Sequence, residues 1–195
     1  GETIGQALVQ DKRTCGVVFT GSTATARAIN RALAARDASI APLIAETGGQ
    51  NCMIVDSSAL IEQTVDDMVL SAFGSAGQRC SALRVAFVQE EIAGELFAVL
   101  KGAVAQLKVG DPAKASTDIG PVIDDDAYRM LEKHAQRMQK QGKPIARAVL
   151  PGHAASQRLV APQIYEIPSL KVLDGEVFGP ILHVIRYPAA KLDQV

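Results

Sequence analysis

Short apolar runs rich in β-branched residues alternate with segments of helical periodicity along most of the chain. Residues 15–21 (CGVVFTG), 41–49 (APLIAETGG) and 51–56 (NCMIVD) are three such runs. Residues 23–37, between the first two runs, carry apolar side chains at helical spacing. A strand, a helix and another strand within about 30 residues are typical of a parallel sheet. The alternation therefore predicts an α/β fold.

Side-chain caps indicate where the predicted helices begin. In chain order these caps are Ser22 or Thr23, Ser57 or Ser58, and Asp124, whose helix ends at Gly142. The other predicted elements are strands over 82–89, 158–167 and 181–187 and a helix over 90–110. No element is predicted for residues 143–157, which are rich in turn formers and have no clear period.

The charge and the apolar pattern exclude several classes of protein. The 195 residues carry a net charge of −1, with Lys and Arg scattered along the chain. Because phosphate backbones are bound mainly by clustered positive charge, no nucleic-acid binding is expected through this segment. The first residues lack the charged start and apolar core of a signal peptide, and no apolar run is long enough to cross a membrane.

The cysteines Cys15, Cys52 and Cys80 are odd in number and widely spaced, which fits neither a disulfide framework nor a zinc site. A reducing, cytoplasmic setting is therefore expected. Cys15 and Cys52 lie in apolar strands, which predicts buried thiols. No metal site is predicted. No role is predicted for the three histidines, which are His134, His153 and His183.

Cys80 stands in residues 72–84 (AFGSAGQRCSALR), among small and polar residues. Small residues before a cysteine let the backbone approach a ligand closely, and a loop there can direct N–H groups at an oxyanion. A thiol in this setting can act as a nucleophile. The alternative is a buried free cysteine, which is common. The polar neighbours Gln78, Arg79 and Ser81 favour the nucleophile.

Glu46 lies in residues 43–51 (LIAETGGQN), between an apolar strand and a pair of glycines. Apolar neighbours raise the pKa of a carboxylate, and a raised pKa suits a general base. A carboxylate in water at the end of a strand, followed by glycines for the turn, fits the same residues equally well.

Two further motifs are open to simpler interpretations. In residues 19–27 (FTGSTATAR), a strand ends on Gly21 and a helix begins, an arrangement that can hold a phosphate. The simpler interpretation is a tight turn with a serine cap. In residues 176–182 (EVFGPIL), Glu176 can bind ribose hydroxyls and Phe178 can pack on a flat ring. The simpler interpretation is a turn before the last strand, with Phe178 in the core.

The four motifs together, in this order, resemble the aldehyde dehydrogenase superfamily, and the resemblance covers nearly the whole chain. The matching stretches are FTGST, ETGGQN, GQRCSALR and EVFGP. The spellings AETGGQN, SAGQRCSALRV and TDIGPVID resemble the dehydrogenase domain of the bacterial, bifunctional proline utilization A family. Two residues depart from the wider superfamily: Ala26, where glycine is frequent, and Gln50, where lysine is usual.

The resemblance implies a role for each motif. Cys80 would be the nucleophile and Glu46 the general base, and Arg79 and Ser81 would contact the substrate. An NAD cofactor would be bound by Gly21 and Ser22 at its pyrophosphate, with Thr20 as a further contact. Glu176 would bind its nicotinamide ribose, and Phe178 and Gly48 would lie near the nicotinamide.

The resemblance also implies a reaction, the NAD-dependent oxidation of L-glutamate γ-semialdehyde, a small aldehyde, to L-glutamate in proline catabolism. FAD would belong only to the proline dehydrogenase part of a bifunctional parent, and that parent is expected to be a homo-oligomer. One alternative is another NAD(P)-dependent aldehyde dehydrogenase, for example one that acts on succinate semialdehyde. Another is a catalytically inactive fragment that acts only as a folded module.

The resemblance divides the chain into two incomplete domains. Residues 1–50 would be the C-terminal part of a Rossmann-type NAD-binding domain, and residues 51–195 a truncated catalytic domain. Superfamily members carry an upstream asparagine that completes the oxyanion hole. The 195 residues are therefore expected to be an internal fragment with little activity alone, because losing one oxyanion donor costs about 10²–10³ in rate.

Overall fold

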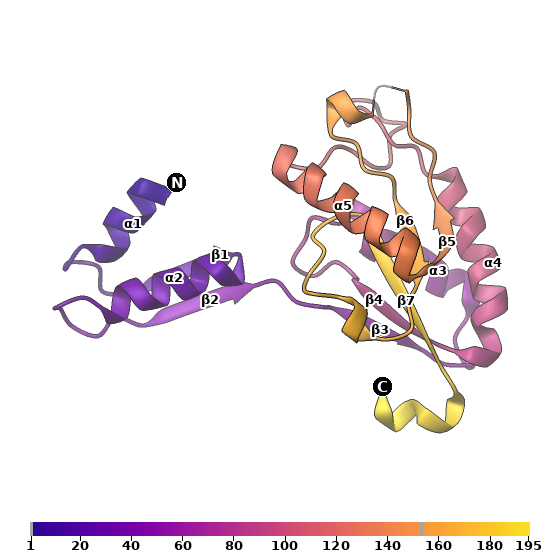
Figure 1. Ribbon diagram of the computed structural model, residues 1–195, viewed down its shortest axis with the longest axis horizontal. Helices are drawn as coiled ribbons and strands as arrows, with labels where there is room; N and C mark the ends of the chain where they lie inside the picture. The colour runs from indigo at the N-terminus through magenta and orange to yellow at the C-terminus, as the bar shows by residue number, and fades with distance from the viewer. Residues whose placement is uncertain (1, 153) are drawn as a thin grey trace. The chain divides into compact units, whose positions relative to one another are not determined.

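The computed structural model describes residues 2–152 and 154–195, which belong to two compact units, residues 1–49 and 50–195. Each unit is described by itself. The first contains α1 (Glu2–Gln10), β1 (Val17–Gly21), α2 (Thr23–Ala34) and β2 (Leu43–Thr47) (Figure 1). The division falls one residue before the domain boundary expected from the sequence.

The first unit is a two-stranded parallel sheet with helices. In the register of β1 and β2, Thr20 lies beside Glu46 and Gly21 beside Thr47. Helix α2 begins after Ser22, whose Oγ accepts a hydrogen bond from the N–H of Thr25 at 3.1 Å. Of the two caps that the sequence allowed, Ser22 is therefore the one used.

The second unit is built around a five-stranded sheet. Its strands are β3 (Cys52–Val55), β4 (Val85–Gln89), β5 (Lys143–Arg147), β6 (Gln163–Glu166) and β7 (Ile181–Tyr187). Its α-helices are α3 (Ile61–Phe73), α4 (Glu90–Gln106) and α5 (Asp125–Gln141). The strand order is β3-β4-β7-β6-β5, and every pair is parallel except β5 with β6. The predicted α/β class is confirmed.

The side-chain alternation of β7 shows that helices cover both faces of this sheet. Arg186 stacks on the ring of Phe97 in α4, whereas His183 contacts His134 in α5. Because Arg186 and His183 are three residues apart in one strand, their side chains point to opposite faces. Figure 1 shows α5 passing in front of β6 and β7.

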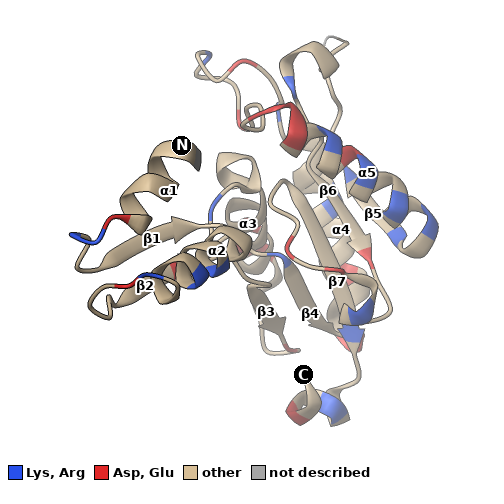
Figure 2. Ribbon diagram, turned by 60° about the vertical axis from the view of Figure 1, so that its left-hand side comes forward, with Lys and Arg blue, Asp and Glu red and all other residues tan. Residues whose placement is uncertain are grey.

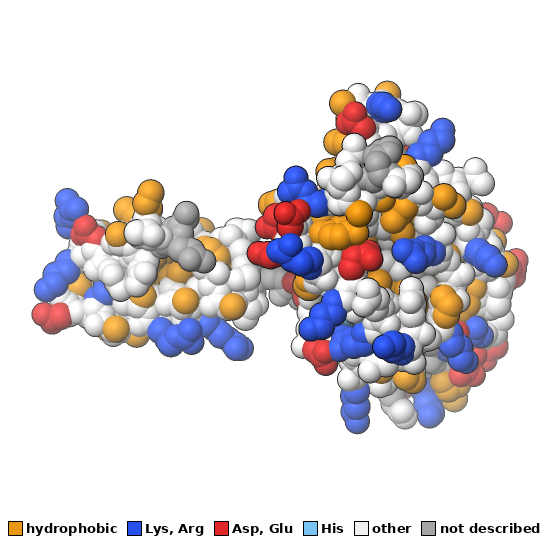
Figure 3. All heavy atoms as spheres, turned by 45° about the horizontal axis from the view of Figure 1, so that its top comes forward, with side chains coloured by type: hydrophobic (Ala, Val, Ile, Leu, Met, Phe, Trp, Pro, Cys, Tyr) orange, Lys and Arg blue, Asp and Glu red, His pale blue; other side chains and the backbone are white. Residues whose placement is uncertain are grey.

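Apolar side chains from both helical layers fill the core. The largest of them that are fully buried include Met68 and Phe73 of α3, Leu96 and Leu100 of α4, and Leu131 and Met138 of α5. Helix α5 begins with Asp125 and Asp126, and most of the charged residues that follow along it are Lys or Arg (Figure 2). Apolar and charged side chains are interspersed on the face of the second unit that Figure 3 displays.

Several predicted boundaries are wrong, each for a local reason. Helix α3 begins at Ile61 and not at a serine cap, because Asp56 Oδ1 accepts hydrogen bonds from both the N–H and the Oγ–H of Ser58 in a turn. Helix α4 ends at Gln106 and not near Gly110, because Leu107 is extended and leads to a bridge between Val109 and Ile119.

The segment without a predicted element contains β5. This strand lies at the edge of the sheet and pairs antiparallel with β6, with an irregularity between Pro144 and Ala146. An edge position tolerates Pro144, because proline lacks the N–H that a central strand needs. Within the described part of the chain, no helix is long and apolar enough to span a membrane.

Candidate active site

The ten predicted site residues divide evenly between the two units. The first unit carries Thr20, Gly21, Ser22, Glu46 and Gly48, and the second carries Arg79, Cys80, Ser81, Glu176 and Phe178. Joint action of Glu46 and Cys80 on one substrate stays a prediction.

The carboxyl ends of β1 and β2 bring the first group together. Thr20 and Gly21 end β1 next to Glu46 and Thr47 of β2, and Gly48 follows directly. Ligands of parallel α/β sheets bind at this end of the strands. Glu46 itself lies within β2 and is exposed, which fits the interpretation of a solvated strand-end carboxylate.

The beginning of α2 suits the phosphates of a dinucleotide. The first amides of an α-helix have no partner inside the helix, and Ser22 Oγ takes one of them, that of Thr25. Gly21 and Ser22 are exposed, and the first turn of α2 contains no acidic residue that would repel an anion.

Cys80 lies in an exposed turn that follows a strained segment. After α3, a 3-10 turn spans Gly74–Gly77, and Ser75, Ala76 and Gly77 all have positive φ angles, between 53° and 65°. Left-handed conformations at residues other than glycine are costly and persist only where surrounding contacts hold them. The strained segment lies between the end of α3 and the exposed Cys80.

Side chains on both sides hold the cysteine turn. Asn51 Nδ2 donates to the carbonyl of Cys80 at 2.6 Å and to that of Ala82 at 3.0 Å. Gln78 Oε1 accepts from the N–H of Ile123 at 2.8 Å, which ties the turn to the segment before α5. The polar residues of this motif therefore act as anchors of the turn.

Arg84 joins the cysteine turn to the Glu-Phe motif. Its side chain is only 1% exposed. Its guanidinium donates to the carbonyls of Gly77 at 2.6 Å and Arg79 at 3.0 Å, and to Glu176 Oε1 at 3.2 Å. It also lies 5.1 Å from the ring centroid of Phe178. Burial lowers the pKa of Arg84, although its bond to Glu176 works in the opposite direction.

Arg84 is not among the site residues predicted from the sequence. A signal was available, because Arg84 directly precedes the apolar run of β4 and a charge there needs partners. Its partners lie up to 95 residues away in sequence, so no local pattern identifies them.

Glu176 lies at the wall of a cavity, and Phe178 lies beside Arg84. Arg84 binds one carboxylate oxygen of the half-buried Glu176. The cavity, of about 380 Å³, is lined by Glu176 together with Lys133, His134 and Arg137. A fixed carboxylate beside such a cavity fits the hydroxyl groups of a ribose. Phe178 is half-buried and packs on Arg84, so it is not part of the core.

Arg79 and Ser81 line a second cavity of about 330 Å³, together with Met53, Asp67, Leu70 and Ser71. Arg79 also donates to the carbonyl of Leu70 at 3.2 Å, near the C-terminal end of α3. The cavity thus brings together the two residues predicted to contact the substrate, which flank Cys80 in the sequence.

The predicted burial of Cys15 and Cys52 is wrong, since both are exposed. Cys15 precedes β1, where its thiol contacts the carbonyl of Arg13 at 3.2 Å, and Cys52 begins the edge strand β3. Among the described residues, no group of His, Cys, Asp and Glu is arranged to hold a metal. His153 lies outside the described residues.

Acid is expected to destabilise the fold through His134 and His183. Burial lowers the pKa of each ring from 6.5 to about 4, and the neighbouring cations Arg137 and Arg84 add to this effect. In the unfolded chain both rings regain a pKa of about 6.5 and bind protons that the folded state excludes. The free energy of unfolding should therefore be highest above pH 6.5 and fall as the pH decreases toward 4.

Urea denaturation between pH 4 and pH 8 measures this decline. The double variant H134L/H183L, which has no ring to protonate here, is the control and should lose most of the decline. An equally steep decline in the control would assign it to other groups.

Comparison with known proteins identifies the family of the chain. The model of the aldehyde dehydrogenase family matches residues 1–194. The bifunctional protein PutA of Escherichia coli (strain K12) is 48% identical over 203 residues, which cover 100% of this chain and 15% of that protein. The 1-pyrroline-5-carboxylate dehydrogenase of Geobacillus sp. (strain WCH70) is 32% identical, covering 93% of this chain and 36% of the relative.

The solved structures point the same way. A variant of Bradyrhizobium japonicum proline utilization A superposes with a TM-score of 0.95 at 49% identity, over 100% of this chain and 20% of that one. The chain thus spans between about a seventh and about a third of the length of these relatives. The family match over nearly all residues decides the assignment: the chain belongs to the aldehyde dehydrogenase family.

Proposed function

We propose that the protein to which these 195 residues belong oxidises L-glutamate γ-semialdehyde to L-glutamate in proline catabolism, with Cys80 as the nucleophile. The observation that carries the proposal is the exposed Cys80 on a turn that the buried Arg84 ties to Glu176. The substrate class rests on relatives that are named PutA and 1-pyrroline-5-carboxylate dehydrogenase.

Covalent capture begins the reaction. The thiolate of Cys80 adds to the aldehyde carbon and forms a C–S bond, and the carbonyl oxygen becomes an oxyanion. Arg79 and Ser81, in the cavity beside the turn, would contact the substrate. Holding the adduct in place makes the following step effectively unimolecular. NAD, when bound, supplies the acceptor for the hydride that leaves the adduct carbon, and the adduct becomes a thioester of Cys80.

Hydrolysis of the thioester completes the reaction. Glu46 would take a proton from water, the resulting hydroxide adds to the thioester carbon, and the C–S bond breaks to release glutamate and the Cys80 thiolate. The exposure of Glu46 gives its carboxylate access to water.

Membership of the family implies the use of NAD or NADP, and we propose NAD. Gly21 and Ser22 at the beginning of α2, with Thr20 before them, would hold the pyrophosphate. Glu176 would bind the nicotinamide ribose, and Phe178 and Gly48 would lie near the nicotinamide. If the protein is bifunctional as its PutA relatives are named, FAD would belong to a proline dehydrogenase part outside these residues. We propose a homo-oligomer for the complete protein.

The substrate is tested by assaying the complete protein on two aldehydes. A dehydrogenase for glutamate γ-semialdehyde should show a higher kcat/KM for that aldehyde than for succinate semialdehyde. The reverse order would favour a different aldehyde dehydrogenase. No NADH formation from either aldehyde would favour the folded module without catalytic activity.

Glu46→Gln should separate the two halves of the reaction. The amide cannot take a proton from water, so steady-state NADH formation should fall by about 10²–10⁴-fold. Neither capture of the aldehyde nor hydride transfer needs a base once Cys80 is ionised. One equivalent of NADH per site should therefore still form in a burst. Stopped-flow absorbance measures both phases. If the burst is lost together with the steady-state rate, Glu46 instead acts as the base that deprotonates Cys80.

A further inference from the structure

A chain of buried hydrogen bonds leads from α5 to the backbone of Arg84. Arg137 lies 3.3 Å from Nδ1 of His134, and the Nε2 atoms of His134 and His183 are 2.9 Å apart. Nδ1 of His183 lies 3.2 Å from the carbonyl oxygen of Arg84. His183 is 1% exposed and His134 is 8% exposed, so the bond between the two rings and the bond to Arg84 are shielded from water.

The partners assign the proton on each ring. The carbonyl of Arg84 can only accept, so Nδ1 of His183 carries the hydrogen and its Nε2 accepts. Nε2 of His134 must then donate, which leaves its Nδ1 to accept from Arg137. Both rings are neutral in this arrangement, in agreement with the lowered pKa of each. The hydrogen bonds thus link Arg137, His134, His183 and the carbonyl of Arg84 in that order.

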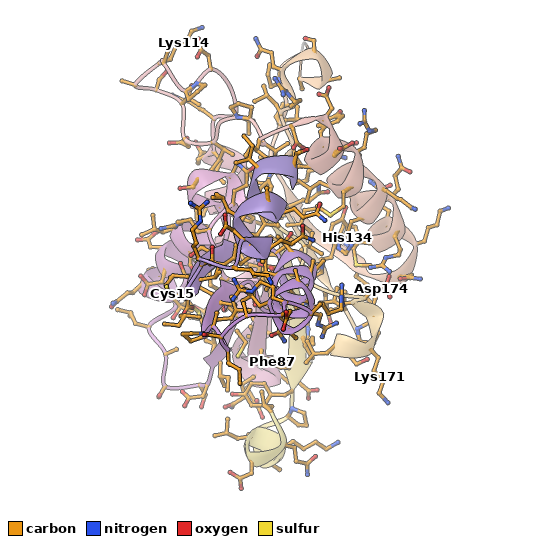
Figure 4. The ribbon with its side chains drawn as sticks, turned by 90° about the vertical axis from the view of Figure 1, so that its left-hand side faces the viewer. Cys15, Phe87, Lys114, His134, Lys171 and Asp174 are labelled. Carbon is orange, nitrogen blue, oxygen red and sulfur yellow. The ribbon has the colours of Figure 1, made fainter. Side chains whose placement is uncertain are left out.

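Two ion pairs close this chain into a ring. Arg137 pairs with Asp174, which precedes Glu176 by two residues, and Glu176 pairs with the guanidinium of Arg84. Figure 4 labels His134 on α5 and Asp174 in the neighbouring loop. The ring therefore holds the segment of Asp174 and Glu176 from two sides, through α5 and through Arg84.

We propose that His134, His183, Arg137 and Asp174 are positioning residues that orient Glu176 for the nicotinamide ribose. This inference rests on the proposed function, in which Glu176 binds that ribose. The hydrogen bonds of a buried polar network strengthen one another, so a break at one point weakens the others. The outermost member, Asp174, is exposed and can be changed with little risk to the fold.

The test measures NAD binding and kinetics of the complete protein. The variants are H134L, which removes the buried hydrogen bonds of His134, and D174A, which removes the ion pair with Arg137 at the surface. The Kd for NAD from titration calorimetry and the KM for NAD should rise about tenfold in H134L, the scale on which orienting partners act. The change in D174A should have the same direction and a smaller size. The KM for the aldehyde should stay within twofold.

The controls separate positioning from a general loss of structure. D126A removes the exposed pair of Asp126 with Arg129, which lies on the same helix outside the ring, and should leave NAD binding unchanged. H134Q keeps one donor and one acceptor and should restore most of the affinity. H134L/D174A should bind NAD about as weakly as H134L alone, because both changes break one ring.

Unchanged NAD affinity in both H134L and D174A, with the wild type binding normally, would overturn the inference and leave the proposed function intact. An equal rise of both KM values, or no recovery in H134Q, would assign the histidines a purely structural role and also overturn it. A wild-type protein that binds no NAD would overturn the proposed function and this inference together.

Discussion

Replacing Cys80 by serine in the complete protein is expected to lower steady-state NADH formation by about 10⁴-fold or more, the scale of losing a catalytic nucleophile. A serine hydroxyl remains protonated near neutral pH, so it cannot add to the aldehyde as the thiolate does. The side chains of Asn51 and Arg84 hold the turn that carries Cys80 through hydrogen bonds to its backbone carbonyls. The substitution should therefore leave the fold and NAD binding unchanged.

The other two cysteines provide matched controls. Cys15 and Cys52 are exposed as Cys80 is, so a general effect of removing a surface thiol would appear in all three variants. Cys15→Ser and Cys52→Ser should keep most of the activity. Retention of more than a tenth of the activity in Cys80→Ser would contradict the nucleophile assignment.

Replacing Gly77 by alanine is expected to destabilise the fold by about 2–5 kcal/mol, through backbone strain and a steric clash. Gly77 has a φ of +65°, and a Cβ atom there would meet the carbonyl oxygen of Gly179 at 2.3 Å and that of Ala72 at 2.9 Å. All of these atoms are backbone, so no side-chain rotation relieves the contact. The displaced turn carries Cys80, so activity should fall by up to about a hundredfold.

Gly94 is the matched control for this substitution. It lies within α4, and a Cβ atom there would meet no other atom within 4 Å. Gly94→Ala should therefore stabilise the protein by about 0.5–1 kcal/mol, since alanine is the better helix former. Thermal unfolding of both variants measures the difference. A loss below 1 kcal/mol for Gly77→Ala would show that the turn relaxes without cost.

Elements whose signals are local could be predicted from the sequence. Helix α5 is an example, because Asp124 caps its beginning with a hydrogen bond to the N–H of Ala127 and Gly142 ends it. Strand β7 is another, because most of its seven residues are apolar and all but Arg186 are buried. The order of short motifs pointed to the family for the same reason, since each motif is contiguous in the chain.

Features that depend on distant partners could not be predicted. Nothing near His134 indicates that His183 is its partner, 49 residues away. Ser75 and Ala76 have positive φ angles although neither residue type favours them, so the sequence carries no local signal for this backbone. Helix α1 is not among the predicted elements, because its segment is compared only with a signal peptide. Strand β5 is not predicted because its pairing with β6, and not its own pattern, makes it a strand.

The central claim is that Cys80 carries the acyl group between hydride transfer and hydrolysis. Mass spectrometry of the Glu46→Gln variant of the complete protein, quenched in acid after mixing with glutamate γ-semialdehyde and NAD, tests it most directly. We predict that the peptide containing Cys80 gains the mass of a glutamyl thioester, while those containing Cys15 and Cys52 remain unmodified. An unmodified Cys80 peptide in a sample that has formed one equivalent of NADH per site would contradict the account.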